Sequence, residues 1–371
     1  MLDSIQVKLA EQGMDVKISW TGEGWSKTYC VNGARLRLAS KKVREVLQSI
    51  AEAYLPRTAS IATYAPFLRR LASEGENLRT ALFSAESQNT CDLQELLNEQ
   101  PEHPEPRNLR VYSDGSVQVP WNFVYAKDSN EIAKPNGTIE DFNDFWSSRF
   151  NITIRFASTD IPPTKPAVRS KIKTLFALHE RRYSTAAAII EQDHPILVKK
   201  ANAMLVHDVG YTDNWSECQI KWKKILKDDS IVYIFAHSNG QSLFLKDEEE
   251  IAIEEKDLFE LDPNGFLKIF GKHADNHSAT LCFINGCRTA DGALGEGFLN
   301  VTSGHGFHGF IGSEAEISNE WATKYAIEFL DRLLSDGKTV EDAYRELRPL
   351  MFPMSLWYSC FAHPKFRIAE G

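Results

Sequence analysis

The spacing of apolar residues changes character near residue 106. Before that point, alternating apolar residues over 15–38 predict a β-hairpin, and apolar residues at helical spacing over 41–54 predict an amphipathic helix. A helical pair is predicted over 61–99. The stretch 101–106, rich in Pro and Glu, is typical of a linker. We therefore expect an α+β region over 1–106 that regulates the protein, recruits a partner or packs as a layer of the domain after the linker.

After the linker, short apolar runs alternate with helical patterns. A hairpin is predicted over 111–121, and two helices are predicted after residue 313. Continuous apolar strands between helices are typical of a mostly parallel sheet that helices cover on both faces. Residues 107–371 are therefore expected to form one α/β domain. Its predicted strands are 150–156, 173–179, 203–210, 230–237, 279–287 and 306–313, with helices beginning near 184 and over 214–227.

The overall charge narrows the range of partners. The 371 residues carry a net charge of −9, whereas broad binding to nucleic acid or to an anionic membrane requires a basic surface. The amino terminus has no signal-peptide pattern, and no apolar run reaches the roughly 20 residues of a membrane span. The six cysteines are scattered without a C-x-x-C pair, so a disulfide framework is not expected. We expect a soluble, cytoplasmic protein that binds neither nucleic acid nor membrane.

Two predicted strands end in residues that could carry chemistry. The run 230–237 ends at His237, and the run 279–287 ends at Cys287. Ligand sites in parallel sheets gather at the carboxyl ends of strands, and a thiol needs a neighbouring base to become a nucleophile. Neighbouring strands would place His237 and Cys287 face to face. Alternatively, the thiol and the imidazole are structural groups of the core.

The segments around these two residues resemble a family. YIFAHSNG (233–240) and CFINGCRTADG (282–292) resemble the paired His and Cys motifs of caspase-like cysteine peptidases of clan CD, in particular the CHAT branch. VPWNFVY (119–125) resembles a segment that often opens a CHAT region, with Asn122 where Glu is usual. Residues 309–348 and 355–368 resemble its closing strands and helices. The resemblance covers about residues 107–368.

The resemblance implies a caspase-like sandwich, with a mostly parallel central sheet flanked by helices. It implies that Cys287 attacks the scissile carbonyl and that His237 acts as general acid and base. The oxyanion would be held by backbone N–H groups beside Gly286 and in the segment from Ser238 to Gly240. Caspase-like motifs often place Gly directly after the His, whereas here Gly stands three residues later. No metal or other cofactor is implied.

In the caspase-like fold, the first specificity pocket lies between the nucleophile strand and the segment after the next strand. By analogy, Asn285, Asp291, Glu314 and Glu316 are the predicted pocket residues. Residues 312–321 contain no Arg, so cutting after Asp is not expected. A carboxylate reaching into the pocket would favour Arg or Lys, because a buried carboxylate needs a cationic partner. We expect the enzyme to cut after a non-acidic residue.

The sequence therefore favours a cysteine endopeptidase that cleaves a specific partner protein. The resemblance suggests a bacterial immune or cell-death system, in which a partner protein or a ligand would activate the peptidase. The alternative is a non-catalytic sensor or scaffold module on the same fold. A metal-dependent hydrolase is a third option, with the histidine pairs His273/His277 and His305/His308 as ligands.

Overall fold

The computed structural model of the chain divides into two compact units, residues 1–158 and 159–371. Within the described residues, no helix combines the length and the apolar character that crossing a bilayer requires. The described residues are 4–52, 61–84, 88–98, 107–113, 117–127, 143–156, 167–168, 173–193, 195–196, 199, 211–225, 228–270, 280–290, 298, 307, 309–351, 354–362 and 365–369.

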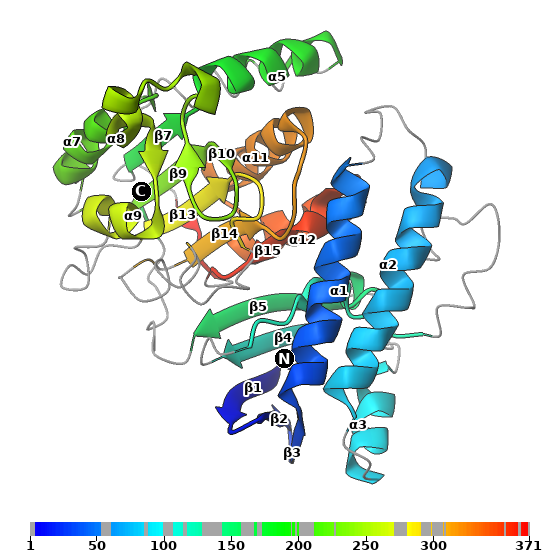
Figure 1. Cartoon of the computed structure of the whole chain (residues 1–371). Helices are drawn as coiled ribbons and strands as arrows, with labels where there is room; N and C mark the ends of the chain where they lie inside the picture. The colour runs from blue at the N-terminus through cyan, green and yellow to red at the C-terminus, as the bar shows by residue number, and fades with distance from the viewer. Residues whose placement is uncertain are drawn as a thin grey trace. The chain divides into compact units, whose positions relative to one another are not determined.

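The described residues of the first unit form a five-stranded mixed sheet in the order β3-β2-β1-β4-β5 (Figure 1). β1, β2 and β3 are antiparallel neighbours, whereas β4 and β5 run parallel to β1. The elements are β1 (Ser4–Gln12), β2 (Asp15–Gly22), β3 (Trp25–Asn32), β4 (Arg107–Ser113), β5 (Phe150–Phe156), α1 (Gly33–Glu52), α2 (Ile61–Leu82), α3 (Gln88–Asn98) and α4 (Trp146–Arg149).

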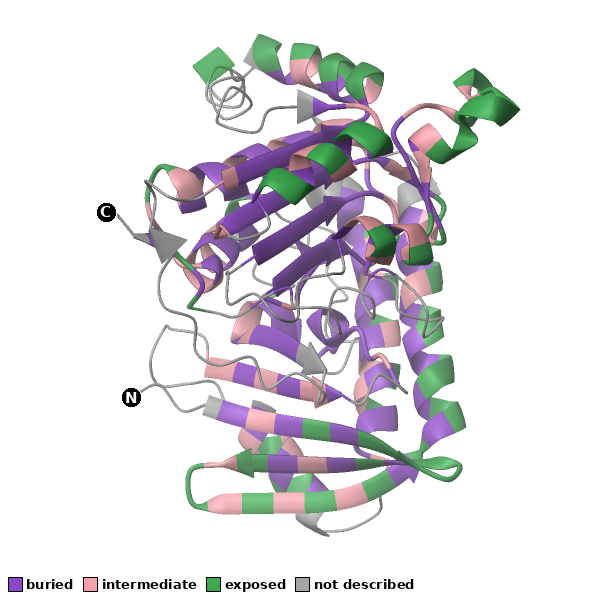
Figure 2. Cartoon of the chain, turned by 90° about the vertical axis from the view of Figure 1, so that its left-hand side faces the viewer, coloured by how far each residue is buried: buried purple, intermediate pink, exposed green. Residues whose placement is uncertain are grey.

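The alternating pattern of β2 creates the core of this unit. Val16, Ile18 and Trp20 are buried, and the residues between them face outward (Figure 2). The Trp20 ring packs against three aromatic rings from other parts of the unit, with centroid distances of 5.8 to 6.2 Å. Rings of this size bury large apolar areas and dominate core energetics. The three partners of Trp20 are Phe83, Trp121 and Trp146.

Two predictions for this unit are wrong, one about where a hairpin ends and one about whether a second hairpin forms. The hairpin arm expected to run through residue 38 ends at Asn32, whose side chain caps α1 by accepting a hydrogen bond of 2.9 Å from the Arg35 N–H. The hairpin predicted over 111–121 does not form, because β4 pairs in parallel with β1 and β5. Residues 117–120 are not a strand, and Pro120 lacks the N–H that a sheet ladder needs.

The unit boundary leads to a prediction. Removal of residues 1–100 takes away β1, β2 and β3, so β4 loses its partner strand and its buried Leu109 becomes exposed. Unpaired apolar edges promote aggregation. The remainder 101–371 should therefore be insoluble, whereas the remainder 159–371 should stay soluble. Size-exclusion chromatography of both fragments measures this, and equal solubility would contradict the boundary. The regulatory role proposed for residues 1–106 stays a prediction.

The described residues of the second unit form a six-stranded sheet in the order β15-β14-β13-β9-β7-β8, parallel except for β15. The mostly parallel sheet flanked by helices is confirmed. The predicted strand 150–156 does not belong to it, because this strand pairs with β4 in the sheet of the first unit, and the predicted strand 203–210 lies outside the described residues. The main elements are β7 (Lys173–Leu178), β8 (Tyr211–Thr212), β9 (Ser230–Phe235), β13 (Thr280–Asn285), β14 (Gly309–Ser313), β15 (Tyr358–Cys360), α5 (Glu180–Asp193), α7 (Trp215–Ile225), α9 (Pro263–Phe270), α11 (Asn319–Leu334) and α12 (Val340–Leu350).

Both faces of this sheet are covered. Every residue of β9 and β13 is buried (Figure 2), as expected for strands with helices on two sides. α5, α11 and α12 share one apolar core with the sheet, while α7 packs on β7 and α9 (Figure 1). The smaller elements of this unit are β6 (Ala167–Val168), β10 (His237–Ser238), β11 (Leu243–Phe244), β12 (Glu260–Leu261), α8 (Lys256–Phe259) and β16 (Ile368–Ala369).

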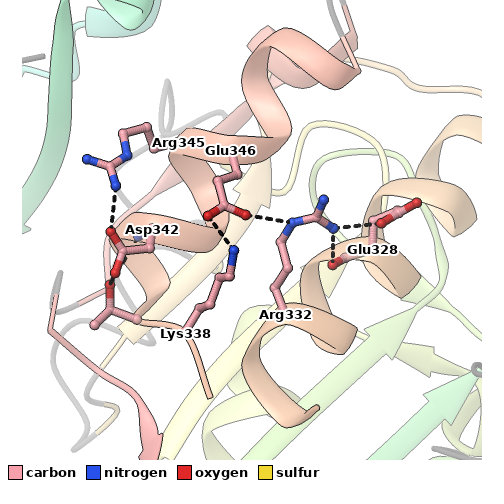
Figure 3. Close-up of polar contacts among 7 residues, drawn as sticks. Glu328, Arg332, Lys338, Asp342, Arg345 and Glu346 are labelled. Carbon is pink, nitrogen blue, oxygen red and sulfur yellow. Dashed lines mark hydrogen bonds and ion pairs between the residues drawn. The ribbon is translucent and has the colours of Figure 1, made fainter. Parts of the chain in front are cut away.

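Ion pairs join α11 to α12 at the edge of this core (Figure 3). Arg332 binds the Glu328 carboxylate one turn earlier at 2.6 Å and the Glu346 carboxylate of α12 at 3.3 Å. Lys338, between the helices, also binds Glu346. Thr339 caps the start of α12, because its hydroxyl oxygen accepts a hydrogen bond of 3.1 Å from the backbone N–H of Asp342. This network fixes the helix pair that shares its apolar core with β13 and β14.

Candidate active site

Three parallel strands end side by side in the second unit. The register pairs Leu178 of β7 with Phe235 of β9, and Phe235 with Asn285 of β13. His237 and Cys287 each follow this registered row by two residues. Equal offsets on neighbouring parallel strands place residues next to each other. His237 and Cys287 therefore follow adjacent strands, β9 and β13, both of which are labelled in Figure 1.

Two glycines let the loops after these strands approach each other. A Cβ atom at Gly286 would lie 2.9 Å from the carbonyl oxygen of Ala236, closer than side chains tolerate, and 3.2 Å from the Ser238 Cβ, which is a tight contact. Gly240 has a φ of 87°, a conformation that glycine adopts readily. A Cβ atom there would lie 3.7 Å from the Cβ of Arg288. The loop after His237 thus contacts the loop after Cys287.

The Cys287 thiol is partly buried at the start of a strained turn. The next residue, Arg288, has a φ of 58°, which is uncommon outside glycine, and its N–H donates to the carbonyl oxygen of Ala315 at 3.3 Å. Burial raises the pKa of the Cys287 thiol. The hydrogen bond from Sγ to the Ile317 carbonyl oxygen at 4.0 Å opposes this shift, and the Glu316 carboxylate adds to it. A raised pKa means that the resting side chain is a thiol.

The His237 ring is half-buried between a cation and an aromatic ring. Its Nδ1 atom lies 3.3 Å from Nη1 of Arg182 in α5, and its centroid lies 6.0 Å from that of Phe244. Burial lowers the pKa of His237, and the Arg182 charge lowers it further. The carboxylate of Glu316 opposes this shift, so Glu316 and Arg182 influence the pKa of both His237 and Cys287. The two side chains share one electrostatic environment.

A third strand end contributes a histidine, the last residue of the strand predicted over 173–179, to which the sequence analysis assigned no functional role. His179 directly follows β7 and is 1% exposed. Its backbone N–H donates to the Phe235 carbonyl oxygen at 2.7 Å. Its Nε2 lies 3.4 Å from Oδ1 of Asp247. Burial lowers the pKa of His179, so the buried ring is neutral. The signal that could have found it is the same one that found His237, an apolar strand that ends in His.

Two predicted oxyanion donors are already engaged in the loop after β10. The Gly240 N–H donates to the buried Ser238 hydroxyl oxygen at 3.1 Å, and the Asn239 N–H donates to the Ser242 carbonyl oxygen at 3.4 Å. The carbonyl oxygen of Gly286 accepts from the Thr289 hydroxyl at 3.3 Å. An oxyanion role for Gly240 would require its present hydrogen bond to open.

The predicted pocket residues separate into different places. The Asn285 amide lies in the core and donates to the Tyr233 hydroxyl at 3.1 Å and to the Ala322 carbonyl oxygen at 2.7 Å. Its oxygen accepts from the Tyr358 hydroxyl at 2.8 Å, so a pocket role does not fit this placement. Asp291 lies outside the described residues. Glu314 and Glu316 point to different surroundings.

Glu314 is 3% exposed, and one of its carboxylate oxygens accepts a hydrogen bond of 2.6 Å from the Ser359 hydroxyl. Glu316 is half-buried and influences the pKa of both His237 and Cys287. Of the two predicted pocket carboxylates, Glu316 is the one whose charge acts on both residues, and it directly precedes Ile317, whose carbonyl oxygen lies 4.0 Å from Cys287 Sγ.

The alternative metal site cannot be built from the part of the chain that the structure describes. The histidines at 273, 277, 305 and 308 lie outside the described residues, and the described ones contain no group of three or more potential metal ligands. Asp247 is the first residue of the acidic stretch 247–255. It forms an ion pair with Arg182 and lies 3.4 Å from Nε2 of His179.

Comparison with known proteins gives a distant likeness in backbone shape. No protein-family model and no curated protein matches the chain. Two separase chains from Saccharomyces cerevisiae separase–securin complexes match at 9% identity, with TM-scores of 0.49 and 0.48, over 98% and 99% of this chain. The chain spans 30% of the length of each of them. A structure described as "Structure of Protease" matches at 12% identity with a TM-score of 0.42, over 91% of this chain and 77% of its own.

Proposed function

We propose that the chain is a cysteine endopeptidase of the caspase-like, CHAT type, with Cys287 as nucleophile and His237 as general acid and base. One observation carries the proposal. β9 and β13 are parallel neighbours, and a histidine and a cysteine follow them at the same offset. The strained turn at Arg288 adds support, because unusual backbone geometry concentrates at functional sites.

In the proposed reaction, Cys287 Sγ attacks the scissile carbonyl carbon as the thiol proton passes to the His237 ring. The carbonyl oxygen becomes an oxyanion that backbone N–H groups beside Gly286 stabilise. The C–N bond then breaks, and His237 gives its proton to the departing amine. Water attacks the resulting thioester, His237 takes the proton of that water, and the thiol is restored.

The test of the proposal is incubation of the full chain with candidate partner proteins, with cut sites identified by mass spectrometry. Cuts that require both His237 and Cys287 would support it. The resemblance to CHAT peptidases suggests one specific partner protein as substrate, in a bacterial immune or cell-death system. The alternative is a non-catalytic sensor or scaffold, and two features favour it: the protonated resting thiol of Cys287 and the Arg182 guanidinium that contacts the His237 ring. An intact chain that binds a partner without cutting it would support this alternative.

Residue preference is expected to depend on Glu316. Its half-buried carboxylate next to the dyad should favour Arg or Lys before the scissile bond. Glu316→Gln should reduce that preference by up to about fivefold, the effect of losing one partly exposed ion pair of about 1 kcal/mol. A peptide library with varied residues at the cut position measures the preference.

Glu314→Gln provides the matched control, because the Glu314 carboxylate is buried and binds Ser359. It should leave the residue preference unchanged while the free energy of unfolding falls. Strong cutting after Asp by the unmodified protein, or equal effects of the two substitutions, would contradict the assignment of Glu316.

A further inference from the structure

Arg182 lies between His237 and an acidic side chain. Its Nη1 is 3.3 Å from Nδ1 of His237, and its Nε donates to Oδ1 of Asp247 at 2.7 Å. The Nη2 atom of Arg182 also donates to Asp247. The guanidinium therefore uses one edge to bind the carboxylate and directs another N–H to the imidazole, which suits its planar arrangement of donors.

The chemistry of the two groups determines where the His237 proton lies. A guanidinium is always protonated and has only donors, so Nδ1 of His237 must accept. A neutral imidazole carries one proton, which then resides on Nε2. Protonation of Nδ1 would break the bond to Arg182 and place two cations side by side. The contact thus selects one tautomer of the neutral ring.

Asp247 is itself held by groups from other elements. The backbone N–H of Arg182 donates a weak hydrogen bond of 3.4 Å to Nδ1 of His179, so the proton of this neutral ring lies on Nε2, which is 3.4 Å from Oδ1 of Asp247. Arg181 adds a second cation 3.7 Å from the carboxylate. Burial opposes ionisation, but Arg182, His179 and Arg181 together lower the pKa of Asp247. The carboxylate is therefore charged at neutral pH and anchors the guanidinium.

We propose that Arg182 is a positioning residue for His237, which fixes the neutral ring with its proton on Nε2, and that Asp247 and His179 hold Arg182 in place. The role of this arrangement in catalysis rests on the proposed function, whereas the assignment of the tautomer rests on the contact between Arg182 and His237. With Nδ1 occupied, the ring can donate a proton from Nε2 at rest. It can accept the Cys287 proton at Nδ1 only when the bond to Arg182 opens.

The charged groups around His237 set the direction of the expected change. Burial is the main cause that lowers the pKa of the His237 ring, and the charge of Arg182 in α5 lowers it further. The carboxylates of Glu248, Asp247 and Glu316 raise it. Loss of the Arg182 charge should therefore raise the His237 titration midpoint by about one pH unit. The same loss should allow both neutral tautomers.

The experiment is nitrogen NMR of the full chain with ¹⁵N-labelled histidine, with the His237 signals identified by their absence in His237→Gln. The wild-type ring should show an unprotonated Nδ1 and a protonated Nε2 when neutral. Arg182→Gln should mix the tautomers and raise the midpoint, and Asp247→Asn should also mix the tautomers. Lys224→Gln removes one positive charge from an exposed residue of α7 that is not among the charged groups acting on His237, and it should change neither.

A protonated Nδ1 on the neutral wild-type ring would overturn the proposal, and that measurement needs no variant to fold. An unchanged tautomer and midpoint in folded Arg182→Gln would overturn it as well. If a substrate is cleaved, the acid limb of the kcat/KM profile should move to higher pH with the NMR midpoint. An NMR change together with a partner protein that is bound but not cut would support the role of Arg182 and contradict the peptidase proposal.

Discussion

Cys287→Ala is expected to abolish cleavage of the true substrate, with a loss of at least about 10⁴-fold in kcat/KM. His237→Ala should cause a similar loss, because the thiol is unreactive without a base that accepts its proton. The double variant should be no worse than either single variant, since residues that act as one unit show strongly non-additive effects. Quantification of the cleaved partner protein over time measures all three rates.

Cys282→Ala is the internal control for the nucleophile. Cys282 is fully buried in β13 on the face toward α7, where burial raises its pKa well above the usual range and Cys218 adds to the effect. Its replacement should reduce the free energy of unfolding by about 1 kcal/mol through the cavity that it leaves, with the cleavage rate intact. Wild-type cleavage by Cys287→Ala would show that the nucleophile is another residue.

Asn285→Ala is expected to destabilise the second unit by about 3 kcal/mol. The substitution leaves the buried hydroxyl groups of Tyr233 and Tyr358 and the carbonyl oxygen of Ala322 without this partner. Each unsatisfied buried polar group costs about 1 to 3 kcal/mol. Urea denaturation followed by circular dichroism measures the change in the free energy of unfolding.

Asn264→Ala gives the matched comparison, since Asn264 is an exposed residue of α9. Its effect should stay within about 0.5 kcal/mol, as is usual for surface substitutions. The opposite pattern, a stable Asn285→Ala protein with an altered residue preference, would restore the pocket role that the sequence suggested for Asn285.

Several tertiary pairings could not be read from local patterns. The alternating apolar residues of 107–113 fit a hairpin with the next segment as well as a parallel pairing with β1. The pairing with β1 therefore depends on contacts with residues far away in sequence. The same holds for Asn285, because an amide at the end of an apolar strand can face a pocket or a buried pair of tyrosines. Only the positions of Tyr233 and Tyr358 decide between these.

The sequence by itself determined that His237 and Cys287 follow buried strands and that the second unit is a helix-covered parallel sheet. These features depend on hydrophobic spacing within single elements, which is a local property. The tertiary structure alone decided that β9 and β13 are neighbours, that the Glu316 charge acts on both His237 and Cys287, and that Arg182 contacts the His237 ring. Arg182 stands 55 residues from His237, and its sequence context is that of any charged helix residue. Its contact exists only because the packing of α5 against the sheet brings it to the strand ends.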